Sequence, residues 1–482
     1  MRFRASELCR ILDASLVGVD VDIDGATQDS RSLAPGMLFV PLVAERDGHD
    51  FITDAAANGA AAYLSERPRR ADVAATAIIV ADTATALRTI GAHARHRLTG
   101  QVIAITGSAG KTSTKDLCAA AFGARWRTHA SAKSFNNEIG VPLTLCNAPD
   151  DCEAAVVEMG ARGVGHIADL CAIAAPSIAI VTLVGAAHLE LFGDLDTVAR
   201  AKGEIVESLP SSGLAVLNAD DERVLAMRSR TTARVLTYGR MGDVRARDVV
   251  LDSELRPRFA VDTPWGSATV ALGARGAHNV NNALAAIGAA VAAGAPLEAV
   301  AATLGRPVLS AWRMEVSRAP NGLLVINDAY NANPVSMRAA LDALAAATAV
   351  RRIAVLGPMA ELGEGSVAAH RAAGAYAARL GVEVVAVATP HYGAMPVADA
   401  DAALRALDAL GLGPNDAVLV KASRVSGLEG VAAALLGDGR GARRRTMTRS
   451  ALRPPRTHRR CVPRISRRHG CTIRIVTSTH RR

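Results

Sequence analysis

Aromatic side chains and lysine are both scarce in this chain of 482 residues. Phe, Trp and Tyr make up 3% of the sequence, too few for the stacking platforms on which single-strand nucleic-acid binders place bases. Lysine occurs five times among 55 basic residues. An amine can be depressed in pKa, acylated or carbamylated, whereas a guanidinium cannot. Each retained lysine is therefore a candidate for a task that arginine cannot perform.

Cysteine pairs, a secretory leader and a long apolar run are also missing. The seven cysteines include no Cys-x-x-Cys spacing, which fits reduced thiols. No apolar region follows the first arginines, so no secretory signal is visible. The longest uncharged stretch, residues 276–297, consists mostly of Ala, Gly and Asn, which are too weakly apolar to predict a membrane span. We expect a cytoplasmic protein without a transmembrane segment.

Acidic residues are missing from one end of the chain. Residues 440–482 contain 15 Arg and no Asp, Glu or Lys, while the whole chain has a net charge of +9. Subtracting those 15 charges leaves −6 for the rest, so the body is not expected to bind nucleic acid as part of its function. Residues 437–482 also lack apolar periodicity, and we expect a disordered basic tail without a catalytic role.

A chain that ends near Leu436 should keep its activity and lose its binding to polyanion resins at low salt. Arginines without acidic neighbours bind polyanions by releasing counterions, and this affinity falls steeply as salt rises. Chromatography of the full and shortened chains over a salt series measures the difference. Loss of activity or solubility on shortening would show instead that the tail packs against the preceding domain.

Apolar runs that alternate with helical patterns predict an α/β protein, and the length suits about three domains. We expect a first α/β domain at residues 1–98, a central domain at 99–310 and a third at 311–436, followed by the tail at 437–482. The central and third domains are each expected to hold a parallel, helix-covered sheet. The strands predicted for these sheets are residues 102–106, 154–157, 178–183, 214–217, 323–326, 353–356, 382–387 and 417–420.

A glycine-containing segment directly follows the apolar run at 102–106. Its residues are Gly107, Ser108, Ala109, Gly110, Lys111 and Thr112. Glycines let backbone N–H groups face phosphate oxygens at a helix N-terminus, Lys111 can reach the β- and γ-phosphates, and the Thr112 hydroxyl can ligate Mg²⁺. Only two residues separate the glycines, where the general phosphate loop has four, so the alternative is an ordinary strand-to-helix turn. The flanking strand and helix favour binding of a nucleoside triphosphate.

Polar residues follow several of the predicted strands, where ligands bind in open α/β sheets. They are Glu158, His188, Asn218, Asp220 and Asp328. Glu158 provides a carboxylate for Mg²⁺ held against Thr112, the alternative being a helix cap. His188 provides a second metal ligand, the alternative being an ordinary core or surface histidine.

Seven segments in the same order resemble those of the Mur ligase family, whose members build the peptide stem of bacterial peptidoglycan. The segments are residues 106–112, 136–143, 158–160, 188–190, 202–204, 278–283 and 312–315. The resemblance runs from about residue 20 to 436. It implies a uridine-nucleotide substrate domain, a central ATP-binding domain and a Rossmann-like C-terminal domain.

The segments 328–334 and 361–364 are similar to the branch of the family that joins D-alanyl-D-alanine to UDP-N-acetylmuramoyl-tripeptide. That branch forms a C–N bond through an acyl phosphate and releases ADP and phosphate. The alternatives are the ligase that adds the third residue of the stem, a folylpolyglutamate synthase-like ligase and, from another class, a phosphate-loop protein that uses ATP as a switch. Two positions depart from the family pattern, Pro358 and Ala422.

The resemblance also implies roles for individual residues, with ATP and Mg²⁺ as cofactors. The expected catalytic residues are Lys111, His188, Lys202 and Arg313. ATP is expected at residues 107–112 and at Asn279, Arg313, Asp328, Tyr330 and Asn331. The substrates are expected to contact Ser30, Arg31, Asp47, His49, Asn136, Asn137, Glu138, Lys421 and Ser423. The expected metal ligands are Thr112, Glu158, His188 and Lys202, the last as a carbamate. We expect the enzyme to be a monomer whose partners are its two substrates.

Overall fold

The structure is a computed structural model that describes residues 1–132, 134–186 and 189–437. His188, one of the predicted metal ligands, lies outside these residues. The basic tail beyond residue 437 also lies outside them. The predictions made for His188 and for disorder of the tail therefore remain predictions.

Residues 1–98 hold two small sheets. Their strands are β1 (Arg2–Arg4), β2 (Ser15–Val17), β3 (Asp22–Asp24), β4 (Ala26–Thr27), β5 (Leu38–Phe39), β6 (Ala62–Ser65) and β7 (Thr76–Ile79). The helices are α1 (Ala5–Leu12), α2 (Ile52–Ala57) and α3 (Thr83–Arg97), with 3₁₀ turns η1 (Ser30–Ser32) and η2 (Gly48–Phe51). One sheet has the order β2-β7-β6-β5-β4, and β1 pairs with β3. Only β2 runs antiparallel to its neighbour in the five-stranded sheet.

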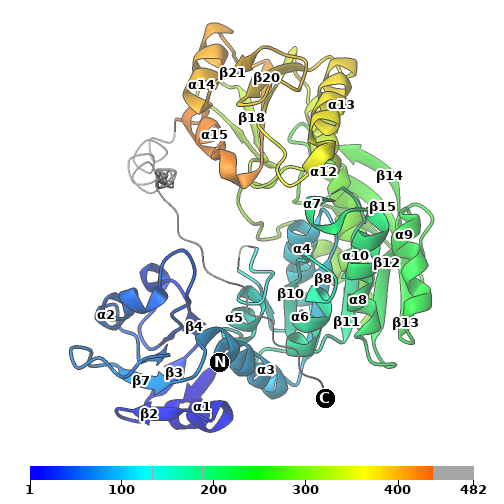
Figure 1. Ribbon diagram of the computed structural model, residues 1–482. Helices are drawn as coiled ribbons and strands as arrows, with labels where there is room; N and C mark the ends of the chain where they lie inside the picture. The colour runs from blue at the N-terminus through cyan, green and yellow to red at the C-terminus, as the bar shows by residue number, and fades with distance from the viewer. Residues whose placement is uncertain (133, 187–188, 438–482) are drawn as a thin grey trace, which may run out of the picture. The chain divides into compact units, whose positions relative to one another are not determined.

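The central segment is built on a six-stranded sheet in which every pairing is parallel. Its strands are β8 (Gln101–Thr106), β9 (Thr128–Ala130), β10 (Ala154–Glu158), β11 (Ile178–Val181), β12 (Leu214–Asn218) and β13 (Arg234–Tyr238). The strand order is β13-β12-β11-β8-β10-β9 (Figure 1). The chain therefore leaves β8 toward one edge of the sheet and later fills the other side. This reversal makes the carboxyl end of β8 the topological switch point, where open α/β sheets bind ligands.

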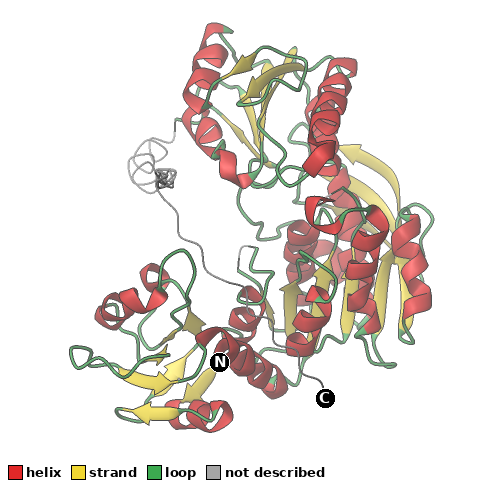
Figure 2. Ribbon diagram, in the orientation of Figure 1, coloured by secondary structure: helices red, strands yellow, loops and turns green. Residues whose placement is uncertain are grey.

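Helices cover both faces of this central sheet (Figure 2). The helices of the central segment are α4 (Lys111–Gly123), α5 (Gly140–Cys146), α6 (His166–Ala174), α7 (Leu189–Phe192), α8 (Leu195–Glu207), α9 (Glu222–Ala226), α10 (His278–Ala292) and α11 (Leu297–Thr303), with a 3₁₀ turn η3 (Met227–Arg230). Along β8, Val102 and Ala104 join one buried cluster while Ile103 and Ile105 join another. Successive side chains of a strand point to opposite faces, so a strand buried on both faces appears as a continuous apolar run.

An antiparallel sheet in the central segment was not predicted. It consists of β14 (Arg245–Leu251), β15 (Pro257–Thr263) and β16 (Gly266–Ala271) in that order. Buried and less buried residues alternate along β15 and β16. Half-buried strands alternate apolar and polar residues, so a search for continuous apolar runs misses them.

The C-terminal segment holds a second six-stranded sheet. Its strands are β17 (Glu315–Arg318), β18 (Leu324–Asn327), β19 (Arg351–Leu356), β20 (Glu383–Val387), β21 (Pro396–Val397) and β22 (Asp416–Lys421). Its helices are α12 (Pro334–Ala346), α13 (Ser366–Arg379), α14 (Ala400–Ala409) and α15 (Glu429–Leu435), with 3₁₀ turns η4 (Gly363–Gly365) and η5 (Arg424–Ser426). The order is β17-β18-β22-β19-β20-β21, and only the edge strand β17 pairs antiparallel.

The fold class predicted from the sequence is confirmed. Each of the eight predicted apolar runs contains a strand, and each sheet lies within one of the three predicted domain ranges. The exact domain boundaries stay a prediction, since one buried cluster runs from α3 into the central sheet. The uncharged stretch at 276–297 contains the buried helix α10, and no helix among the described residues is both long and apolar enough to cross a membrane.

Candidate active site

The glycine-containing segment joins the end of β8 to the start of α4. Gly107 has φ of 148° and Gly110 has φ of 82°, both in the region that favours glycine. A Cβ atom on Gly107 would lie 1.8 Å from Oγ1 of Thr182, and that hydroxyl donates to the Ala109 carbonyl at 2.6 Å. The Ser108 hydroxyl donates to the Gly185 carbonyl at 3.0 Å and accepts from its N–H at 2.9 Å. The loop is thus held in a tight, fixed turn rather than an ordinary one.

Gly107→Ala should destabilise the protein and weaken nucleotide binding. The added methyl would collide with Thr182, and the left-handed φ alone costs about 1–3 kcal/mol for a non-glycine residue. Gly123→Ala is the matched control, because a Cβ there meets nothing within 4 Å. Thermal unfolding and titration with a non-hydrolysable ATP analogue measure both effects. Equal behaviour of the two variants would contradict this account of the loop.

Lys111 opens α4 and lines a cavity of about 680 Å³. Its amine donates to the Gly107 carbonyl at 2.8 Å, so it folds back over the loop. Burial lowers the pKa of this amine and nearby Arg313 lowers it further, whereas the Glu158 carboxylate opposes the shift. A phosphate bound over the loop would place a negative charge next to the Lys111 amine and would stabilise its protonated form.

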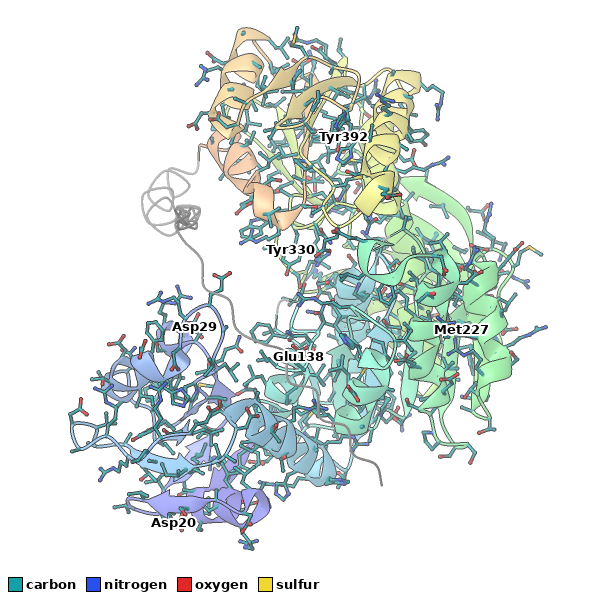
Figure 3. The ribbon with its side chains drawn as sticks, viewed as in Figure 1. Asp20, Asp29, Glu138, Met227, Tyr330 and Tyr392 are labelled. Atoms are coloured by element: carbon teal, nitrogen blue, oxygen red, sulfur yellow. The ribbon has the colours of Figure 1, made fainter. Side chains whose placement is uncertain are left out.

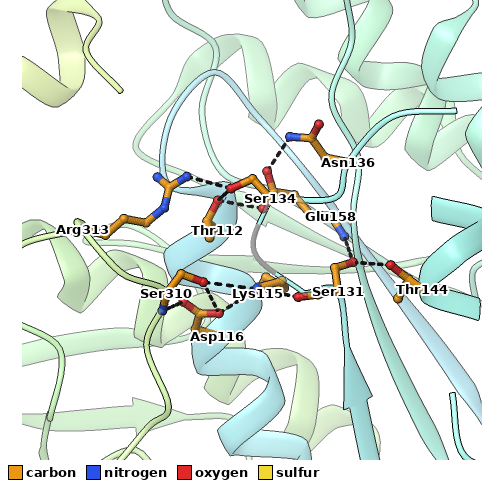
Figure 4. A network of polar contacts seen from close by, with 10 residues as sticks. All are labelled: Thr112, Lys115, Asp116, Ser131, Ser134, Asn136, Thr144, Glu158, Ser310 and Arg313. Carbon is orange, nitrogen blue, oxygen red and sulfur yellow. Dashed lines mark hydrogen bonds and ion pairs between the residues drawn. The ribbon is translucent and has the colours of Figure 1, made fainter. Parts of the chain in front are cut away.

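Thr112 and Glu158 form a direct contact at the centre of a polar network (Figure 4). The Thr112 hydroxyl donates to Oε2 of Glu158 at 2.7 Å, while the amide of Asn136 donates to Oε1 at 2.8 Å. Ser134 lies 3.2 Å from the Thr112 hydroxyl and accepts from the Arg313 guanidinium at 3.1 Å. Glu158 ends β10 and faces Thr112, so it does not act as the helix cap that was the alternative.

Lys202 lies within α8 and is 3% exposed, yet it also lines the cavity. Within the described residues, no hydrogen bond or ion pair reaches its amine. Burial lowers the pKa of the amine well below the ordinary value, and the nearby Lys111 lowers it further. Its sequence neighbours have structural roles: Glu204 accepts from the backbone N–H groups of Gly165 and Ala168 around the start of α6.

Residues from the C-terminal segment line the same cavity. The guanidinium of Arg313 lies 4.2 Å from the ring centre of Tyr330, which Figure 3 labels. Asp328 pairs with the buried amine of Lys421, and that amine also donates to the Asn331 carbonyl at 3.0 Å. The polar residues that follow β18 are therefore held together before any ligand binds.

Fifteen of the predicted site residues line this cavity. They are Ser108, Ala109, Gly110, Lys111, Thr112, Asn136, Asn137, Glu138, Glu158, Lys202, Arg313, Asp328, Tyr330, Asn331 and Lys421. Among the described residues, no group of three or more His, Cys, Asp or Glu side chains is arranged to hold a metal ion. A metal here would therefore depend on mixed oxygen donors.

Other predicted residues lie away from the cavity wall. Asn279 donates to the Arg275 carbonyl at 2.7 Å and accepts from Asn282 at 2.7 Å, while its neighbour His278 lines the cavity. The Ser423 hydroxyl accepts from the Ala360 N–H at 2.8 Å. These two side chains hydrogen-bond to neighbouring residues of the protein, and their predicted ligand contacts are untested.

The predicted uridine-nucleotide residues lie in two short turns of the N-terminal segment. Asp29 pairs with Arg31 at 2.8 Å and caps η1, where Ser30 is buried. Asp47 caps η2 and contacts Nδ1 of buried His49 at 2.7 Å. Hydrogen bonds from the backbone and ring of His49 lower the pKa of Asp47 to about 2. None of these residues lines the 680 Å³ cavity.

Several cavity residues were not predicted. They include Arg88, Ser134, Arg162, His166, Thr182 and His278. Lys115 and Asp116, in the interior of α4, were assigned no role, although the rarity of lysine had marked Lys115 as a candidate.

The two departures from the family pattern are accommodated locally. Among the described residues, Ala422 is not one of those with a positive φ. Its methyl group lies close to Gly357, where an added Cβ would be 2.7 Å from it. Its backbone therefore tolerates a side chain. Pro358 provides the carbonyl that accepts from the Ser423 N–H at 3.0 Å.

Known families and proteins match most of this chain. The Mur ligase middle domain matches residues 105–290, and the Mur ligase, glutamate ligase domain matches residues 312–424. A UDP-N-acetylmuramoyl-tripeptide--D-alanyl-D-alanine ligase of Mycobacterium bovis is 42% identical, covering 85% of this chain and 91% of that protein. The Escherichia coli protein of the same name is 38% identical, covering 90% and 98%.

Solved structures agree with these matches. A crystal structure of MurF from Acinetobacter baumannii has a TM-score of 0.82 and 32% identity, covering 91% of this chain and 99% of that one. MurF ligase from Thermotoga maritima in complex with ADP has a TM-score of 0.72 and 26% identity, covering 87% and 98%. The order of the sheets, the phosphate loop at the switch point and these similarities together show that the chain belongs to the Mur ligase family.

Proposed function

We propose that this enzyme joins D-alanyl-D-alanine to UDP-N-acetylmuramoyl-tripeptide with ATP as the energy source, in the synthesis of peptidoglycan precursors. Relatives of that name match the chain at 42% and 38% identity over most of its length. The observation that carries the proposal is the shared cavity, where the phosphate loop, Glu158 and Lys202 meet Arg313 and Asn331. A protein that uses ATP only as a switch would not need side chains such as Lys202 to bind the carboxylate of a second substrate.

The reaction requires activation, because a carboxylate is a poor electrophile. Transfer of the γ-phosphoryl group to the tripeptide carboxylate forms an acyl phosphate and ADP. The amine of D-alanyl-D-alanine then attacks the carbonyl carbon, loses a proton, and phosphate leaves as the amide forms. Phosphoryl transfer depends mainly on positioning and charge neutralisation. Lys111 and Arg313 would hold the γ-phosphate, and the buried Nε of Arg313 has no hydrogen-bond partner among the described residues.

The oxygen donors of Thr112 and Glu158 fit Mg²⁺. This ion prefers hard oxygen ligands and binds through one or two carboxylates together with substrate phosphates. The Thr112 hydroxyl and the Glu158 carboxylate lie 2.7 Å apart and face the cavity. When bound, Mg²⁺ would neutralise charge on the phosphates. Asn136 and Ser134 would hold the two ligand side chains in place.

Lys202 as an ammonium does not fit a metal site, because it has no lone pair to donate. We propose that it is carbamylated. A neutral amine adds CO₂ to form an N-carboxylate with release of one proton, and this converts a cation into an oxygen ligand. Its lowered pKa raises the fraction of neutral amine near neutral pH. Burying an ammonium group without a charged partner costs free energy. Carbamylation would avoid this cost, because it replaces the ammonium of Lys202 with a carbamate. We propose that the carbamylated Lys202 and His188 would together hold a second Mg²⁺.

We also propose that the enzyme acts as a monomer in the cytoplasm. Five buried cysteines in the described residues are free thiols, as expected for a reducing compartment. Light scattering of the purified chain tests the monomer directly.

Phosphate release from purified enzyme, ATP and UDP-N-acetylmuramoyl-tripeptide tests the function. Release should depend on both the tripeptide and D-alanyl-D-alanine, and the product should gain the mass of the dipeptide less water. Tripeptides ending in diaminopimelate and in lysine are compared, because the resemblance leaves the third residue open. Phosphate release that ignores D-alanyl-D-alanine and yields no pentapeptide would refute the proposal.

A further inference from the structure

A buried ion pair inside α4 connects the phosphate loop helix with the linker that carries Arg313. Lys115 and Asp116 are 3% and 6% exposed, and the Lys115 amine lies 2.8 Å from Oδ1 of Asp116. Both residues also contact Ser310, which is 194 positions away from Asp116 along the chain. Asp116 accepts from the Ser310 N–H at 2.7 Å and from its hydroxyl at 3.1 Å, while the Lys115 amine lies 3.4 Å from that hydroxyl. Ser310, which is partly buried, is therefore held by charge-assisted bonds to two buried side chains, and such bonds are stronger than those between neutral groups.

The same lysine is connected through Ser131 to the backbone of Glu158 (Figure 4). Its amine donates to the Ser131 carbonyl at 2.8 Å. The Ser131 hydroxyl in turn accepts from the Glu158 N–H at 3.3 Å and from the Thr144 hydroxyl at 3.2 Å. Lys115 thus connects the linker with the backbone on which the Thr112–Glu158 contact depends.

The linker after Ser310 has a demanding conformation. Trp312 and Met314 have φ values of 60° and 51°, which bulky residues adopt only when their surroundings hold them. Arg313, between them, reaches Ser134 at 3.1 Å and stacks on Tyr330. Beyond Arg313, the Met314 N–H donates to Asp328 at 3.0 Å. The linker is thus held at both sides of Arg313, by α4 before it and by Asp328 after it.

We infer that Lys115 and Asp116 are positioning residues that place Arg313 against the phosphate loop by holding Ser310. Neither side chain lines the cavity, so neither touches the substrates. The expected loss of kcat rests on the proposed ligase function, whereas the expected loosening of the linker around Ser310 does not.

Hydrogen exchange of the unliganded full chain tests the anchoring itself. In Asp116→Asn the amides of residues 308–316 should exchange about tenfold faster than in the unsubstituted enzyme, because the Ser310 N–H loses its charged acceptor. Asp416→Asn is the matched control. It breaks another ion pair with a buried carboxylate, to Arg351 at 2.7 Å, in the C-terminal sheet. Unchanged exchange at 308–316 in Asp116→Asn would overturn the inference.

Steady-state kinetics test the effect on Arg313. Asp116→Asn should lower kcat about 10- to 100-fold, as expected for a misplaced charge, and leave KM for ATP within about twofold. In an Arg313→Lys background the same substitution should have little further effect, because the two residues act through one interaction. Equal losses in both backgrounds would overturn the inference by showing that the pair supports only the fold.

Two further comparisons keep the outcomes separate. If Asp116→Asn does not fold, Lys115→Met/Asp116→Leu removes both charges together, which buried pairs tolerate better than loss of one partner. An unsubstituted enzyme that gives no pentapeptide refutes the proposed function, while the exchange comparison still decides the role of the pair. Normal turnover and normal linker exchange in the double variant would refute the positioning role alone.

Discussion

Lys111→Ala is expected to lower phosphate release about 10²- to 10³-fold or more while the fold remains intact. The amine lines the cavity beside the Thr112–Glu158 contact, and removing a charge that faces a developing phosphate charge costs at least this much in enzymes of known mechanism. The hydrogen bond of the amine to the Gly107 carbonyl is a local one. Little stability should therefore be lost.

Phosphate release with saturating tripeptide and D-alanyl-D-alanine measures this effect, and thermal unfolding checks the fold. Lys111→Met serves as the control for side-chain length, because it keeps the apolar stem and removes the charge. Both variants should be inactive and should unfold near the temperature of the unsubstituted enzyme. Near-normal phosphate release in either variant would show that this segment does not act on a nucleotide.

Lys202→Ala is expected to abolish ligation, and short carboxylic acids are expected to restore part of the activity. The substitution removes the amine that would carry the carbamate, and a small carboxylate can occupy the space left by a side chain that is almost fully buried. Formate, acetate and propionate are titrated into the variant, and phosphate release is measured. The same acids added to Lys111→Ala should restore nothing, since that site requires a cation. Full activity of Lys202→Ala without any acid would remove this residue from the mechanism.

The carbamate itself has a spectroscopic signature and a pH dependence. Enzyme equilibrated with ¹³C-bicarbonate should show a carbamate carbon signal that Lys202→Ala lacks. The neutral amine forms the carbamate, so the signal should decline as pH falls through the pKa of Lys202. Burial lowers that pKa, and the signal should therefore persist at a lower pH than for an exposed lysine. Absence of the signal at high pH would contradict carbamylation.

Local patterns were sufficient to predict the layers of this fold. The runs beginning at Val102 and Leu324 are continuous because their strands are buried on both faces. The two glycines of the phosphate loop appear where the chain turns with positive φ. Both signals depend on neighbours within a few positions, so they are visible before folding. The strands β14 to β16 escaped this approach because β15 and β16 bury only alternate residues and β14 has no buried residue.

Long-range contacts completed the candidate site. Arg313 and Ser134 are 179 positions apart, and Asp116 and Ser310 are 194 apart. No spacing rule connects such pairs, since their meeting depends on how whole sheets and linkers pack. Lys115 shows the difference between the two kinds of information. The rarity of lysine in the sequence marks it as unusual, but its contact with the linker appears only after folding.

The pattern of residues along the chain thus specifies an α/β protein with a phosphate loop, because periodicity and glycine placement act locally, and the resemblance of its motifs to a known family adds the ligase reaction. The three-dimensional packing specifies which of the candidate side chains share one cavity and which, such as Asn279 and His49, lie outside its wall. It also specifies the connection from α4 to the Arg313 linker. That connection is formed by buried polar groups that must find partners on folding, and which partners they find depends on residues distant in the sequence.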